Sequence, residues 1–231
     1  PQTTHSGQPG VDVAVDAGTG TGAHFEDELI IRRLLLAAML DNTRTALAGN
    51  VAIGLTTAAV LHLAGNGGPG LWLWVAAIAV LVVLRARHAI RLKPRVQALD
   101  DVPLRRAERQ ITALLAAQGA VWGALPWLGY GGADPFVDFF TVAMLVGMTA
   151  GAVNSASSQP RALNAYIMLA LLPFAVRAVG LGGLVNVAGA LTIVFSALVL
   201  FAFARGAYRA TRATLVVTRQ NARLAEALRQ E

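Results

Sequence analysis

The chain has 231 residues, of which 55% are hydrophobic and only 14% are charged, a balance too apolar for a soluble domain of ordinary composition. The formal net charge of +6 does not indicate nucleic-acid binding, because the basic residues stand between apolar stretches, where membrane topology and anionic lipid headgroups account for them. The absence of cysteine excludes a disulfide framework, a thiolate nucleophile and a cysteine metal site.

The N-terminal part of the chain divides into two segments of different composition. Residues 1–23 are rich in Gly, Thr, Asp and Val without helical periodicity, and they lack the order of a secretory signal, so we expect a disordered tail. In residues 24–45, the acidic residues 26–28 suit the first turn of a helix, and Arg32 and Arg33 interrupt the apolar residues. These apolar runs are too short to cross a bilayer, which predicts an interfacial helix on the cytoplasmic leaflet.

Six later stretches are long and apolar enough to cross a hydrocarbon core of about 30 Å, which takes roughly 20 helical residues. They fall within a transmembrane domain at 46–204 and comprise 47–64, 70–84, 111–130, 136–156, 163–181 and 184–204. The second stretch is short, and we expect Arg85 and Arg87 at its end to snorkel toward the headgroups. The sequence therefore predicts an all-α polytopic membrane protein with a six-helix bundle.

The basic residues predict the orientation of this bundle. All of the nineteen Lys and Arg residues except Arg177 lie on one side of the implied membrane, eight of them in the loop at 85–109. The positive-inside rule then places both termini in the cytoplasm. Aromatic residues that favour the outer interface lie on the other side, at Trp72, Trp74, Trp127 and Tyr130.

Residues 205–231 continue the last span as a helix without a breaker. A heptad reading places five residues on one seam: Thr214, Val217, Asn221, Leu224 and Leu228. A polar Asn on such a seam specifies the register of a parallel dimer, so we expect a homodimer through this cytoplasmic coiled-coil helix. The alternative is an amphipathic end that lies on the membrane.

Ionisable residues near the outer ends of the spans are candidate ligand-binding residues, because charges in lipid usually face the bundle interior and pair. Asp138 lies near the outer end of the fourth span, and Arg177 lies near that of the fifth. We expect them to form an ion pair that lines an outward-facing pocket. The alternative is that each side chain snorkels to the outer headgroups.

Proline kinks predict a cavity on the same side. Pro126 and Pro173 interrupt the third and fifth spans, and Trp122 and Trp127 lie beside the first of these kinks. This arrangement predicts an outward-opening cavity for a small, largely apolar ligand. His62 near the outer end of the first span is a further candidate, but it has no second ligand at metal-binding spacing, so we predict neither a metal site nor a cofactor.

Polar amides and small residues inside the spans predict helix packing. Interhelical hydrogen bonds are the expected role of Asn50, Gln118, Asn154, Asn164 and Asn186, two of which flank a short turn that they could also cap. The glycine pairs 119/123 and 147/151 have the four-residue spacing that lets helices approach closely within a bundle.

Four segments resemble the six-helix N-terminal module of bacterial sensor proteins: NTRTALAGN, LRRAERQITALLAAQGAVWG, GMTAGAVNSASSQPRALNAYIMLALLPFAVR and RGAYRATRATLVVTRQNARLAEALRQE. The resemblance covers about residues 40–231. In that family the module precedes a histidine kinase core, often of a hybrid kinase, or a GGDEF diguanylate cyclase. The ending NARLAEALRQE is similar to the linker before a kinase dimerisation helix.

The resemblance implies a sensor module of a two-component histidine kinase in the bacterial inner membrane, acting on a cognate response regulator through an output domain beyond residue 231. Membrane lipids and a small ligand are its expected partners. No phosphoacceptor His motif, ATP-lid glycines or GGDEF motif occurs in the sequence, so no catalytic residue is carried over. A diguanylate cyclase module, a small transporter or channel and an integral membrane enzyme are the alternatives, although the sequence shows no convincing internal repeat and no polar catalytic cluster.

Overall fold

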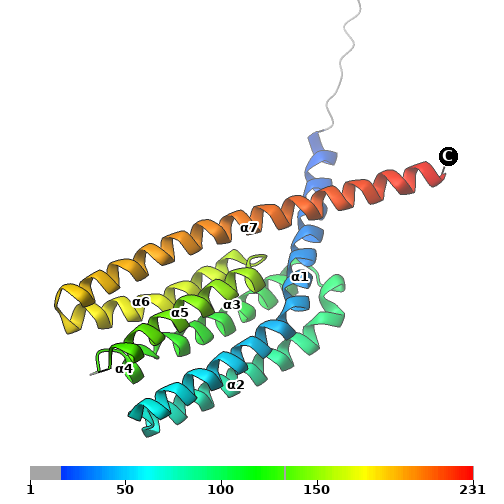
Figure 1. Ribbon diagram of the computed structural model, residues 1–231. Coiled ribbons are helices and arrows are strands. Elements are labelled where there is room, and N and C mark those ends of the chain that lie inside the picture. Colours follow the sequence, from blue (N-terminus) through cyan, green and yellow to red (C-terminus); the bar gives the residue numbers. More distant parts are fainter. Residues whose placement is uncertain (1–16, 133, 231) are drawn as a thin grey trace, which may run out of the picture.

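The computed structural model describes residues 17–132 and 134–230, and this part of the chain is built from helices and short turns without a strand (Figure 1). The helices are α1 (Ala17–Leu61), the π-helical turn η1 (His62–Asn66), α2 (Pro69–Leu92), the 3₁₀ turn η2 (Lys93–Ala98), α3 (Asp101–Gly123), the short α4 (Pro126–Gly129), α5 (Pro135–Ala156), α6 (Pro160–Leu181) and α7 (Leu184–Gln230).

The surface of the bundle is that of a multi-pass membrane protein. Six helical segments in the described ranges are long and apolar enough to cross a membrane, which confirms the predicted all-α six-helix bundle. Large hydrophobic side chains stand exposed along them, including Leu73 at 73%, Phe139 at 72% and Phe195 at 67% exposure. Apolar surface of this extent requires lipid rather than water around it.

Glycines set the close packing of α3 on α6 in the middle of the bundle. A Cβ atom on Gly119 would lie 2.5 Å from the carbonyl oxygen of Tyr166, and one on Gly123 would collide with the carbonyl of Leu169. The predicted packing role of this glycine pair is therefore confirmed. Gly147 and Gly151 on α5 have no neighbour within 4 Å of an added Cβ, so the packing prediction was wrong for them.

The two prolines in the spans act differently. Pro126 stands at the first position of α4, after α3 has ended at Gly123, so the third span is interrupted as predicted. Pro173 lies inside α6, which continues to Leu181. Because proline has no N–H, the Leu169 carbonyl one turn earlier lacks its helical donor, and this is the carbonyl against which Gly123 packs.

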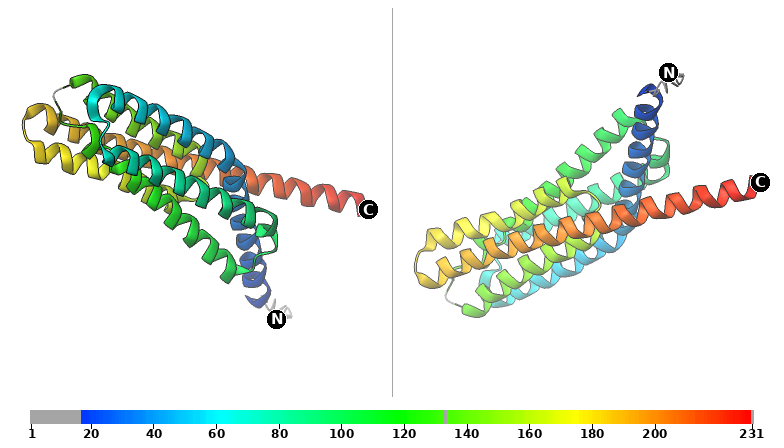
Figure 2. Two further views of the ribbon diagram at one scale, coloured as in Figure 1. Left: turned by 90° about the horizontal axis from the view of Figure 1, so that it is seen from below. Right: turned by 90° about the horizontal axis from the view of Figure 1, so that it is seen from above.

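The predicted interfacial helix and first span form one helix, α1. It begins at Ala17, so the predicted limit of the tail at residue 23 was wrong, and the acidic residues 26–28 do not occupy its first turn. Residues 1–16 lie outside the described part of the chain. In Figures 1 and 2, the first part of α1 runs across the end of the bundle and the second part runs beside α2. The change of direction occurs without a break in helical structure.

The last span and the predicted exit helix also form one helix, as the absence of a breaker predicted. α7 runs from Leu184 to Gln230 and leaves the bundle as a single rod. Its end at Gln230 and the start of α1 at Ala17 lie at the same end of the bundle (Figure 2). We call this the basic end, because it also carries η2 and the Arg-rich start of α3.

Candidate functional site

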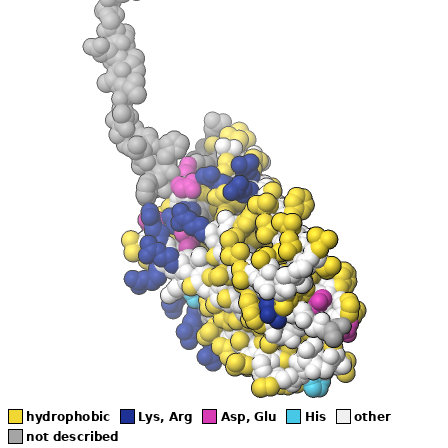
Figure 3. Space-filling view, turned by 90° about the vertical axis from the view of Figure 1, so that its left-hand side faces the viewer, with side chains coloured by type: hydrophobic (Ala, Val, Ile, Leu, Met, Phe, Trp, Pro, Cys, Tyr) yellow, Lys and Arg dark blue, Asp and Glu magenta, His cyan; other side chains and the backbone are white. Residues whose placement is uncertain are grey.

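The two ends of the bundle differ in charge. Figure 3 looks onto the end away from the termini, where hydrophobic and uncharged atoms dominate, while Lys and Arg side chains gather behind it at the basic end. Among the ion pairs of the described residues, all seven lie at the basic end. Contacts between opposite charges are therefore concentrated at the basic end.

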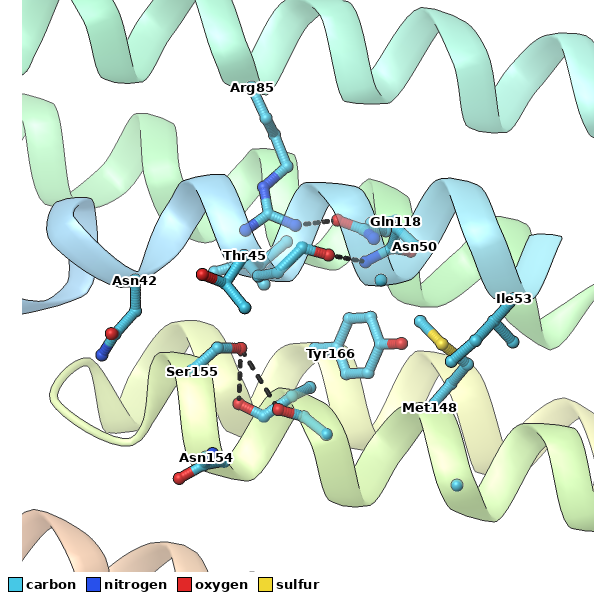
Figure 4. A pocket seen from close by; sticks show the side chains of 16 residues that line it. Asn42, Thr45, Asn50, Ile53, Arg85, Gln118, Met148, Asn154, Ser155 and Tyr166 are labelled. Atoms are coloured by element: carbon cyan, nitrogen blue, oxygen red, sulfur yellow. Dashed lines mark hydrogen bonds between the residues drawn. The ribbon is translucent and has the colours of Figure 1, made fainter. Parts of the chain in front are cut away.

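A cavity of about 300 Å³ opens between α1 and α5 toward the basic end (Figure 4). Side chains of α2, α3 and α6 complete its walls. Asn42 and Asn154 lie at its polar rim, and Ile53 and Met148 lie deeper in the bundle. The cavity is therefore polar near the basic end and apolar toward the membrane interior.

Arg85 supplies the charge of this cavity. Its side chain points from α2 into the bundle, is only 7% exposed, and donates a hydrogen bond from Nη1 to Oε1 of Gln118 on α3. The prediction that Arg85 snorkels to the headgroups was therefore wrong, whereas its neighbour Arg87 is exposed. Within the described ranges, Arg85 forms no ion pair with a carboxylate. A buried guanidinium without a counter-ion is costly in a membrane protein.

Two further polar groups line the same space. Tyr166 of α6 is 1% exposed, and its hydroxyl has no hydrogen-bond partner in the portion of the chain that is described. Asn50 of α1 accepts a hydrogen bond from Nε1 of Trp122 at 3.0 Å and donates one to the carbonyl of Ala46 at 3.1 Å. Asn50 is thus satisfied by the protein, while Arg85 and Tyr166 retain unused hydrogen-bonding capacity.

Glycines keep the cavity open. Gly49 of α1 and the α5 residues Gly147 and Gly151 line it, and a Cβ added at any of the three would meet no atom within 4 Å. Side chains at these positions would project into open space. This explains why the second glycine pair does not pack: it borders the cavity instead of another helix.

The predicted ion pair between Asp138 and Arg177 does not form. Asp138 Oδ1 accepts a hydrogen bond from the backbone N–H of Gly131 at 2.7 Å, across a turn in which Gly131 has a φ of +85°. Nε of Arg177 is buried and has no partner among the described residues. The carboxylate is used locally to close the turn before α5.

The aromatic and histidine candidates do not form one site. Trp122 is fully buried, packs edge-on against Trp74 with ring centroids 5.2 Å apart, and reaches the cavity only through Asn50. Trp127 is 53% exposed, and His62 stands exposed in η1 with its ring 5.7 Å from that of Trp72. Trp74 points inward and donates Nε1–H to the carbonyl of Val121.

The cavity residues were missed as a ligand site. The sequence predicted Asn50 and Gln118 as packing amides, a role that both hydrogen bonds confirm, and it placed the ligand cavity at the opposite end near Trp127. The sequence feature that could have indicated this site is Arg85, a charged residue at the end of the shortest apolar stretch. Whether such a side chain turns outward or inward depends on its neighbours from other helices.

A set of polar contacts, which we call the α1 clamp, joins the first part of α1 to α3 and α7. Arg32 pairs with Asp101 and Glu108 of α3, at 2.7 Å in each case. On the side of α7, the contacts are Glu28–Arg212 at 2.7 Å and Asp27–Arg219 at 3.0 Å. The same helix that borders the cavity at Asn42–Ile53 is therefore fastened to the exit helix.

No group of three or more metal-ligating side chains occurs in the described ranges. Comparison of the chain with models of known protein families, with curated proteins and with solved structures finds no match.

Proposed function

We propose that the chain is the sensory input module of a bacterial signal-transduction protein, and that its output is a histidine kinase acting on a response regulator. The supporting observation is α7, one uninterrupted helix from Leu184 to Gln230. Its first half contributes buried residues to the bundle, including Ile193 and Ala204, and its second half projects beyond the bundle. A continuous helix of this kind carries a rotation or a tilt from the bundle to a following domain.

The projecting half of α7 presents the predicted seam. Val217, Leu224 and Leu228 are 53%, 64% and 74% exposed, and Thr214 and Asn221 are exposed as well. The five positions follow the 3-4 spacing of a coiled coil, and apolar residues at such positions gain stability when a second helix covers them. We therefore propose a parallel homodimer through α7.

The α1 clamp supports a transmission route from the cavity to the seam. α1 contributes Asn42–Ile53 to one side of the cavity, and its residues Asp27 and Glu28 contact α7. A change in the separation of α1 and α5 on ligand binding would thus shift the contact that holds α7. The ligand changes the equilibrium only through different affinities for the two arrangements.

Kinase output is preferred to cyclase output because NARLAEALRQE resembles the linker before a kinase dimerisation helix. Both outputs would use the same exit helix. The exit helix is tested by a fusion of residues 1–231 to a histidine kinase core, in which Leu224→Asp should abolish regulated autophosphorylation because a charge on the seam opposes pairing. Regulation of the kinase core but not of a diguanylate cyclase fused at the same residue would favour kinase output.

The dimer itself is tested by cysteine cross-linking, which is free of background because the chain has no native cysteine. Leu224→Cys on the seam should form a disulfide-linked dimer in membranes under mild oxidation. Ala222→Cys, also exposed but off the seam, is the matched control and should remain monomeric. Equal yields from the two variants would refute the proposed seam.

A further inference from the structure

The cavity next to Arg85 contains an unpaired positive charge. Arg85 is only 7% exposed, and its hydrogen bond to Gln118 uses one of the five N–H donors of a guanidinium. The Tyr166 hydroxyl also lacks a partner in the described part of the chain, but it points toward Ile53 and Met148, away from the guanidinium (Figure 4). A group that carries a negative charge and accepts hydrogen bonds would satisfy Arg85.

The charge of the lining limits the charge of the ligand. Among the described residues that line the cavity, Arg85 is the one charged side chain. A single negative charge balances it, whereas a phosphate monoester carries about −1.5 to −2 at neutral pH and would leave an excess. A planar carboxylate also matches the two parallel N–H groups of a guanidinium.

The remaining lining residues indicate the size and polarity of the rest of the ligand. Ile53, Leu115 and Met148 provide apolar walls beyond the polar rim, and the glycines at 147 and 151 leave the side facing α5 open. The volume of about 300 Å³ is at the lower limit of ordinary small-molecule pockets. The space therefore suits a short apolar body attached to a small polar head.

We propose that this cavity binds a small organic monocarboxylate, with its carboxylate on Arg85 and its apolar body against Ile53 and Met148. The ligand class deepens the proposed sensory function and rests on it. The carboxylate could reach the cavity from the aqueous phase, as a soluble acid, or from the bilayer, as a medium-chain acid.

The test is calorimetric titration of the 231-residue chain in phosphatidylcholine nanodiscs. Octanoate, which partitions into the bilayer, and phenylacetate, which remains soluble, represent the two sources, and octanamide is the uncharged control. We expect saturable binding of one or both acids and none of octanamide. Binding of octanamide equal to that of octanoate would overturn the proposal, as would the absence of binding by either acid.

A second arm replaces phosphatidylcholine by phosphatidylglycerol. If a lipid phosphate occupied the cavity, this exchange would stabilise the protein against heat and abolish binding of both acids, and the proposal would be overturned. We expect the affinity for the acids to change less than threefold, apart from the general repulsion of anions by the charged surface, which titration of the acids into protein-free nanodiscs of each lipid measures.

Variants locate the site. Arg85→Gln should weaken acid binding at least tenfold, because an uncharged side chain no longer pairs with the carboxylate, while Arg87→Gln on the exposed face of α2 should leave the affinity unchanged. Gly147→Leu provides a test that is independent of the folding of the Arg85 variant. Its side chain enters open space, so we expect a folded protein that has lost acid binding. Unchanged affinity in a folded Gly147→Leu variant would overturn the proposed cavity.

Failure of this inference is distinguishable from failure of the proposed function. Binding that leaves the Leu224→Cys cross-linking yield unchanged would support the ligand site and contradict transmission through α7. Cross-linking on the seam in a protein that binds neither acid would support the dimer and overturn the ligand class.

Discussion

Gly119 and Gly123 allow α3 to pack closely on α6, and the contribution of each glycine to stability can be measured. Gly119→Ala would bring a Cβ to 2.5 Å from the Tyr166 carbonyl, so the helices must separate. We expect a loss of about 1–3 kcal/mol in the free energy of unfolding, the usual effect of overpacking. Gly151→Ala is the control, because its Cβ meets nothing within 4 Å. Reversible unfolding in mixed micelles measures both, and equal losses would contradict the role assigned to Gly119.

The hydrogen bond from Trp122 to Asn50 connects α1 to α3 beside the cavity. A double-mutant cycle with Trp122→Phe and Asn50→Leu should give a coupling free energy of about 0.6–1.7 kcal/mol, the range for interhelical hydrogen bonds inside membrane proteins. Unfolding of the two single variants and of the double variant measures this coupling. Strict additivity of the two losses would show that the 3.0 Å contact contributes nothing to stability.

The sequence predicted which polar side chains must find a hydrogen-bond partner inside the bundle, but it did not predict which way a charged side chain points. An amide in lipid must find a partner, so the roles of Asn50 and Gln118 in helix packing followed from the sequence. The partner of Asp138 did not, because a backbone N–H presented by a turn at Gly131 competes with any distant cation. Arg85 turned inward for a related reason: Gln118 comes from another helix, and the sequence does not say which helices are neighbours.

At the scale of elements, the continuity of α1 has a simple cause. The sequence from Asp41 to Arg44 is polar, and it lies between the apolar residues of the predicted interfacial helix and those of the first span. Helices end at residues that break them, such as glycine or proline, and the segment contains neither. A polar segment therefore separates two apolar stretches without ending the helix. The same reasoning, applied to the end of the last span, correctly predicted the uninterrupted α7.

The α1 clamp gives a prediction about the coupling of elements. Glu28 and Arg212 are 51% and 44% exposed in their side chains, so their ion pair should contribute only about 0–1 kcal/mol to global stability. Glu28→Arg should therefore leave the unfolding midpoint nearly unchanged but raise hydrogen exchange in the part of α7 around residue 212. The reversed pair, Glu28→Arg with Arg212→Glu, should restore protection. Failure of the reversed pair to do so would show that the contact does not hold α7.

For the whole molecule, the fold could be predicted because lipid allows few solutions. Every backbone polar group in the hydrocarbon must be paired within the protein, so long apolar stretches become helices, and their number gives the architecture. The relative placement of the helices depends on details such as the carbonyl freed by Pro173 and the glycine that covers it. These details decide where a cavity remains. The bundle was therefore predictable, and the cavity beside Arg85 was not.

The orientation of the whole chain remains a prediction from its charges, and the lack of native cysteine allows a direct test. Gly132→Cys lies between α4 and α5, at the end away from the termini, whereas Gln97→Cys in η2 and Ala222→Cys in α7 lie at the basic end; all three positions are exposed. The positive-inside rule predicts that a membrane-impermeant maleimide labels only the Gly132 variant in intact bacterial cells. Permeabilised cells should give labelling of all three. An even number of crossings separates Gln97 from Ala222, so the two lie on the same side of the membrane. Labelling of only one of these two variants in intact cells would contradict the six-span topology. Labelling of both, without labelling of the Gly132 variant, would reverse the orientation and place the exit helix outside the cell.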